Sequence, residues 1–125
     1  MILTITVALS MAQFGPPPEP QLPFTYGEAL QCYGVASAAD SAKLDLDIAL
    51  TGNFWASAAI TTGTSGVRSE QIVRMELNAE FVRASRKYLL PTGEVNREAA
   101  DEMNRIAEKC GHLLDKYLGS EGAGN

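Results

Sequence analysis

The sequence predicts a small all-α domain, a three- to four-helix bundle that follows an N-terminal apolar and proline-rich extension and is held by one disulfide. Three observations predict it. Apolar residues recur at intervals of three and four in the second half of the chain, a capping box lies at Thr25, and the two cysteines fall within two of the expected helices. With 125 residues, 46% of them hydrophobic, the chain can build one modest core.

The charge and composition exclude several classes of protein. The chain has 10 Lys and Arg against 15 Asp and Glu, a formal net charge of −5. A protein that binds duplex nucleic acid needs a basic surface to displace counterions, so we expect no nucleic-acid partner. The glycines show no period, and two cysteines are too few for a disulfide-dense scaffold, so collagen-like and disulfide-rich classes are also excluded.

Residues 1–12 have the features of the end of an export signal. The segment is uncharged and largely apolar, and it finishes on Ser10-Met11-Ala12, an A-x-A-like site with a small residue, Ser10 and Ala12, at each position that a signal peptidase recognises. It is too short to span a bilayer, so we expect no transmembrane span. Because no basic residue follows Met1, we expect the natural start to lie upstream. The alternative is a buried strand over residues 2–7, which are rich in β-branched side chains.

Residues 13–24 are expected to form a linker between the cleavage site and the folded domain. They hold five of the six prolines, which favour polyproline II and cannot continue a helix. With cleavage after Ala12, the mature protein begins at Gln13. This arrangement predicts a periplasmic or secreted protein.

The domain is expected to cover residues 25–119, and its first half contains the least certain element. Thr25 and Glu28 match the T-x-x-E capping box, which predicts a helix that begins there and ends near Asp40. Residues 44–50 alternate as in a strand but also pair at i,i+4. We favour a helix there, with a strand as the alternative. Residues 61–66 are threonine, glycine and serine, a composition typical of a loop.

The second half of the domain shows clearer periodicity. Residues 68–90 predict a helix with two adjacent apolar rows. One row contains Ile72, Met75, Ala79 and Val82, and the other contains Val73, Leu77, Phe81, Ala84 and Tyr88. Pro91-Thr92-Gly93 breaks the chain. A last helix begins near Val95 and is expected to end at Gly119, which leaves residues 120–125 as a disordered tail.

Cys32 and Cys110 lie on apolar stripes of the first and last expected helices. In an exported protein, two such cysteines most simply form a disulfide. Gly34 and Gly111, close to them in the sequence, would let the two helices approach closely. The alternative is a pair of separate buried thiols in a cytosolic protein, where cysteine behaves as a small hydrophobic residue.

The sequence contains no arrangement of residues that indicates catalysis. His112 lies about 200° around its helix from Cys110, which places it with Glu108 and Lys116 on the solvent face. A single histidine cannot supply a di-iron bundle site, and no short zinc-ligand spacing is present. Phosphate-binding and dinucleotide-binding glycine motifs are also missing. We therefore expect no enzyme activity, no metal and no cofactor.

Four aromatic residues gather in the first half of the domain: Tyr26, Tyr33, Phe54 and Trp55. Core packing accounts for them, but they could also line a groove between helices with Trp55 at its mouth. Such a groove would take a small apolar ligand or a peptide of a protein partner. The sequence thus predicts an exported, non-catalytic binding or interaction module. The alternative is an accessory subunit that an uncleaved segment 1–12 tethers to a larger membrane complex.

Overall fold

Four α-helices and one 3-10 helix make up the regular structure of residues 22–123, the part of the chain that the computed structural model describes, with side chains as far as residue 119. They are α2 (Tyr26–Ser41), η1 (Asp47–Thr51), α3 (Gly52–Thr64), α4 (Glu70–Tyr88) and α5 (Arg97–Ala123). The predicted all-α bundle is confirmed. The expected signal segment 1–12 and most of the linker 13–24 lie outside the described residues.

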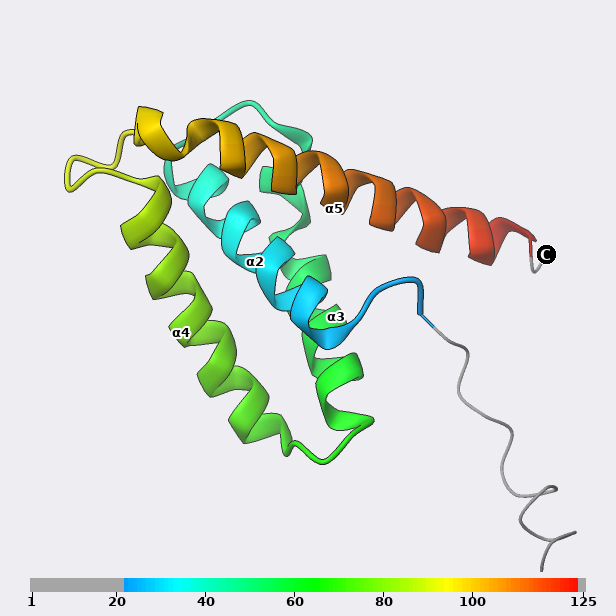
Figure 1. Cartoon of the computed structure of the whole chain (residues 1–125). Coiled ribbons are helices and arrows are strands. Elements are labelled where there is room, and N and C mark those ends of the chain that lie inside the picture. Colours follow the sequence, from blue (N-terminus) through cyan, green and yellow to red (C-terminus); the bar gives the residue numbers. More distant parts are fainter. Residues whose placement is uncertain (1–21, 124–125) are drawn as a thin grey trace, which may run out of the picture.

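Helix α2 is the central element of the bundle. It contacts η1 and each of the other three helices, and α5 lies at an angle to it (Figure 1). The predicted capping box fixes its start, because the Thr25 hydroxyl accepts a hydrogen bond from the Glu28 amide at 3.1 Å while the Glu28 carboxylate accepts one from the Thr25 amide at 2.9 Å. The buried residues of α2 are mostly alanines, which let the surrounding elements approach its backbone.

Residues 44–50 form neither the favoured α-helix nor the alternative strand. The chain is extended at Leu46 (φ −119°, ψ 138°) and then makes the short 3-10 helix η1, which ends with the Thr51 hydroxyl donating to the Ile48 carbonyl at 2.7 Å. The alternating pattern fits this mixture, since Leu44 and Leu46 are half-buried before Ile48 enters the core. A segment this short has no room for the amphipathic turns that would make a longer helix favourable.

The loop expected at residues 61–66 is largely wrong, because α3 continues to Thr64. The hydroxyls of Thr62 and Thr64 donate to the carbonyls of Ala58 and Ile60 at 2.7 and 2.6 Å, so these polar side chains are satisfied within the helix. Gly63 is buried where α3 meets α4. A Cβ atom there would lie 2.6 Å from Val73 Cγ2, so this glycine serves close packing rather than a turn.

The two apolar rows predicted for α4 have different surroundings. In the second row, Val73, Leu77, Ala84 and Tyr88 are buried against the bundle but Phe81 is 37% exposed, whereas all of the first row, Ile72, Met75, Ala79 and Val82, is exposed. The helix ends at the predicted break, where Gly93 adopts the left-handed region (φ 90°) and the Leu90 amide donates to the Glu94 carbonyl at 2.7 Å.

Helix α5 continues past the expected end at Gly119 to Ala123. Residues 120–123 of the expected tail are therefore helical, and the last two residues lie outside the described part of the chain. One glycine within a helix costs only about 1 kcal/mol relative to alanine, which is too little to end a helix by itself. The close approach of α2 and α5 expected at Gly34 and Gly111 occurs at neither glycine. A Cβ on Gly34 would lie 3.1 Å from the Ala84 Cβ of α4, so this glycine lets α4 rather than α5 approach, and a Cβ on Gly111 would have no neighbour within 4 Å.

Candidate functional site

A disulfide between Cys32 of α2 and Cys110 of α5 fixes the position of the site. The predicted bond is confirmed, with an S–S distance of 2.06 Å and a Cα–Cα distance of 5.8 Å. Both cysteines are buried. Because the bond joins the two helices near the middle of α5, it sets which turns of α5 face η1.

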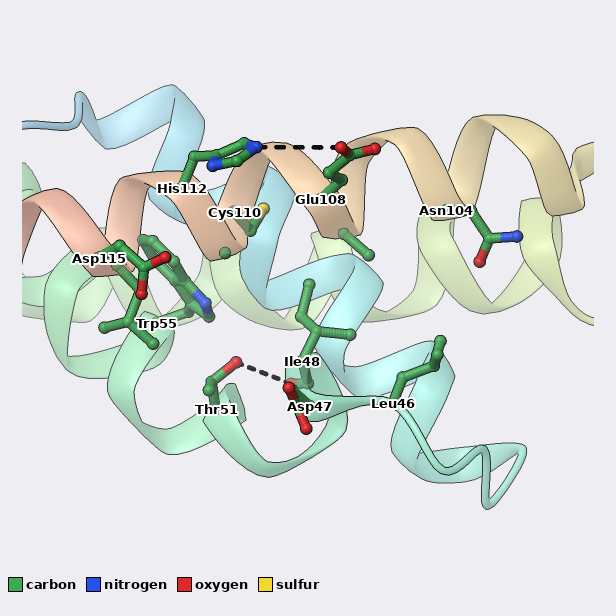
Figure 2. Close-up of a pocket in the computed structure, with 13 residues that line it drawn as sticks. Leu46, Asp47, Ile48, Thr51, Trp55, Asn104, Glu108, Cys110, His112 and Asp115 are labelled. Carbon is green, nitrogen blue, oxygen red and sulfur yellow. Dashed lines mark hydrogen bonds and ion pairs between the residues drawn. The ribbon is translucent and has the colours of Figure 1, made fainter.

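A groove of about 390 Å³ lies between η1 and α5 (Figure 2). Trp55 of α3 lines it together with the apolar side chains of Leu46 and Ile48 on one side and of Ala107 and Leu114 on the other. The groove volume falls in the range of small-ligand sites. The apolar lining can therefore hold a side chain or a small apolar group.

Acidic residues surround this apolar lining. Asp47 projects from η1, and Glu108 and Asp115 project from α5 on the opposite side (Figure 2). All three are exposed, and no lysine or arginine is among the described residues that line the groove. His112 also lines the groove, 3.9 Å from Glu108, and its exposed side chain lies on the solvent side of α5, as predicted. The rim therefore attracts positive charge at neutral pH.

Trp55 belongs both to the core and to the groove. Only 1% of its surface is exposed, and its ring packs edge-on against Phe24 and Phe54 with centroids 5.2 and 4.9 Å apart. Its indole nitrogen lies on the side of the ring toward η1 in Figure 2. The almost fully buried indole therefore forms part of the apolar lining of the groove.

The other aromatic candidates lie elsewhere, so the structure does not gather the four into one groove. Phe54 packs against Tyr117 of α5, with ring centroids 5.3 Å apart. Tyr33 borders a separate hollow beside Phe81 of α4.

Tyr26 lies in a polar cluster between α2 and α4. Its hydroxyl donates to Glu76 Oε1 at 3.0 Å, and the Arg68 guanidinium lies 4.3 Å from its ring centroid. Burial and the hydrogen bond to the carboxylate raise the pKa of Tyr26 to about 12. This tyrosine joins two helices and has no part in the groove between η1 and α5.

Sequence reasoning missed the contribution of α5 to the groove. Asn104, Glu108, Gly111 and Asp115 follow at intervals of 4, 3 and 4, which places them on one face of the helix. This spacing is visible in the sequence, but polar residues at helical intervals usually form a solvated face. Only the position of η1 shows that this face borders a groove.

In the described part of the chain no three His, Cys, Asp or Glu side chains are grouped so that they could hold a metal ion. The two cysteines are bonded to each other, so neither is a free nucleophile. None of the described helices combines the length and the apolar character needed to cross a membrane. Comparison with family models, curated proteins and solved structures gives no match for this chain.

Proposed function

We propose that the protein is an exported, non-catalytic binding module whose groove between η1 and α5 binds a basic peptide segment of a protein partner. The observation that carries this proposal is the combination of an apolar lining at Trp55 with the carboxylates of Asp47, Glu108 and Asp115 around it. A segment in which an apolar side chain lies next to lysine or arginine matches both parts.

The contacts available in the groove suit a peptide. An apolar side chain would pack against Trp55, Ile48 and Leu114. Neighbouring cationic side chains would face the carboxylates on either side. The disulfide supports both parts of the proposal, since it pre-organises the groove and is a bond that persists in oxidising compartments.

The tethered accessory subunit remains an alternative that depends on residues 1–12. No contact of the groove favours it. Determination of the mass of the protein isolated from its native compartment separates the two proposals, because a species that lacks residues 1–12 has no tether.

The chain has a single tryptophan, so fluorescence reports directly on the groove. We expect a five-residue peptide with a central leucine between two lysines on each side to change the Trp55 emission saturably, with an affinity that falls as salt increases. A matched peptide with glutamate in place of lysine should give no change. Equal responses to both peptides, or no response to either, would refute the proposal.

Two variants locate the binding site. Gly111→Leu adds a side chain at a groove position that has open space beside it, so it should block the peptide without disturbing the fold. Glu108→Gln combined with Asp115→Asn should weaken binding about 5- to 30-fold, from about 0.5–1 kcal/mol for each exposed carboxylate. Asp101→Asn removes an exposed carboxylate of α5 outside the groove and should leave the affinity unchanged. If the Gly111→Leu variant bound the peptide with the affinity of the wild type, the peptide would have to bind outside the groove.

A further inference from the structure

Helix α4 has apolar stripes on two opposite faces. The buried stripe of Val73, Leu77, Ala84 and Tyr88 faces the bundle. At 100° per residue, the exposed stripe of Ile72, Met75, Ala79 and Val82 lies about 180° around the helix from it. Ile72, Met75 and Val82 are 44, 61 and 38% exposed. Figure 1 shows α4 at the edge of the bundle, with the other described elements on its inner side.

The exposed stripe has the spacing of a coiled-coil seam. Its members follow at intervals of 3, 4 and 3, which is the a/d pattern of a heptad repeat. A surface helix that needed only to cover its own core would carry polar residues on this face. The small side chain of Ala79 lies near the middle of the stripe, where it lets a second helix approach closely.

The charged residues beside the exposed stripe favour antiparallel packing against α4 of a second copy of the chain. Glu76 and Arg83 flank the same side of the stripe, about 20° apart around the helix and nearly symmetric about Ala79. In an antiparallel pair, Glu76 of each copy therefore lies beside Arg83 of the other. A parallel pair would instead place the basic end of α4, with Arg83, Arg86 and Lys87, against its own copy.

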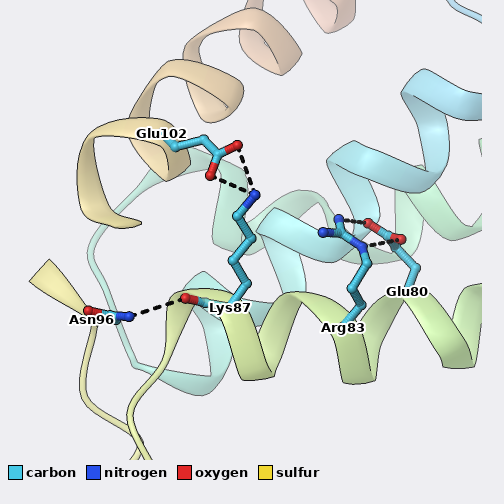
Figure 3. Close-up of polar contacts among 5 residues, drawn as sticks. All are labelled: Glu80, Arg83, Lys87, Asn96 and Glu102. Atoms are coloured by element: carbon cyan, nitrogen blue, oxygen red, sulfur yellow. Dashed lines mark hydrogen bonds and ion pairs between the residues drawn. The ribbon is translucent and has the colours of Figure 1, made fainter. Parts of the chain in front are cut away.

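These flanking charges are accessible despite their present contacts. Glu76 is paired with Arg68 at 3.3 Å, and its side chain is 43% exposed. Arg83 Nε donates to Glu80 Oε2 at 3.0 Å, and Lys87 is paired with Glu102 of α5 (Figure 3). The Arg83 side chain is 50% exposed.

We propose that the exposed stripe of α4 is a self-association surface on which a second copy of this chain packs antiparallel, with Ala79 of both copies near the two-fold axis. A two-fold interface must be complementary to itself, and the placement of Glu76 and Arg83 about Ala79 meets this condition. Met75 of one copy then lies opposite Val82 of the other. The aliphatic part of Arg86 covers Ile72 of the second copy while its guanidinium reaches solvent. This association uses no residue of the groove, so either proposal can fail without the other.

Sedimentation equilibrium on the purified protein tests the association. We expect the mass to rise from that of one 13.4 kDa chain toward twice that value between micromolar and millimolar concentration. Ala79→Glu places two like charges at the two-fold axis and should weaken the dimer at least about 10-fold. Leu118→Glu removes an equally accessible apolar residue, on α5, and should leave the dimer unchanged. A wild-type protein that stays monomeric, or a dimer that Ala79→Glu leaves intact, would overturn the proposal.

Thiol cross-linking tests the orientation. The native cysteines are bonded to each other, so a new cysteine is the only free thiol in the described part of the chain. Met75→Cys mixed with Val82→Cys should give the mixed cross-linked dimer at least about 10-fold faster than either variant alone. Faster cross-linking of Met75→Cys with itself would indicate a parallel pair and contradict the proposed packing.

Discussion

Reduction of the Cys32–Cys110 bond is expected to lower the free energy of unfolding by about 4.5 kcal/mol. The bond joins residues 78 positions apart. Closure of a loop of that length removes chain entropy from the unfolded state worth about 4.5 kcal/mol at 25 °C. The total free energy of unfolding of a domain of this size is typically about 5–15 kcal/mol, so about 30% or more of the stability depends on this bond.

Urea unfolding with and without reductant measures this difference, and Trp55 supplies the signal because it is the only tryptophan and is buried. With a slope of about 1–2 kcal/mol per molar, the urea midpoint should fall by about 2.3–4.5 M. The double variant Cys32→Ala, Cys110→Ala should resemble the reduced protein, with a further loss of about 1–2 kcal/mol for the smaller buried side chains.

A midpoint shift below about 0.5 M would refute the reasoning. It would mean that Met103, Ile106 and Leu113 hold α5 in place without help, or that the unfolded chain is already compact enough to gain little entropy on reduction. Unequal slopes for the two forms would identify the second cause, because the slope follows the surface exposed on unfolding.

Two further predictions concern positions outside the disulfide. Gly63→Ala should destabilise the protein by about 1–3 kcal/mol, because the new methyl group would lie 2.6 Å from Val73, whereas Gly111→Ala has open space and should gain about 0.5–1 kcal/mol of helix propensity. Thermal unfolding of both variants checks this pair, and equal effects would contradict it. The hydrogen bond from the Thr25 amide holds the pKa of Glu28 below its ordinary 4.5, so its contribution to stability is present above pH 4.5 and is lost as the pH falls through the lower folded-state value. Glu28→Gln should therefore lose less stability than the wild type between pH 7 and pH 3 in urea titrations, and identical losses would disprove this role.

Predictions succeeded where the cause of structure is local. The Thr25–Glu28 capping box requires only neighbouring residues, and it fixed the start of α2 correctly. The periodicity of α5 was also informative, because it describes one surface of one helix. The disulfide is the long-range exception, and it was predictable because each cysteine lies on the apolar stripe of its own helix and the chain has only these two. The loop predicted at residues 61–66 failed because composition cannot show that threonine hydroxyls bond back into a helix or that Gly63 is buried against another helix.

The groove depends on long-range geometry, so only part of it was predictable. Trp55 stood out as a candidate from its sequence surroundings, but the turn of α5 that faces it is set by the register of the Cys32–Cys110 bond. Asn104 and Asp115 gave no signal of their own, since a polar helix face looks the same in the sequence whether it borders water or a groove.

The disulfide also determines where the backbone can be cleaved without separating the protein into two molecules. The elements η1, α3 and α4 all lie between Cys32 and Cys110, and so does the exposed connection at residues 65–69. Proteolysis at Arg68 would leave η1 and Trp55 on one fragment and α5 on the other. The disulfide would keep these two fragments covalently joined beside the groove. The cleaved protein would therefore keep η1 and α5, which lie on the two sides of the groove, in one molecule.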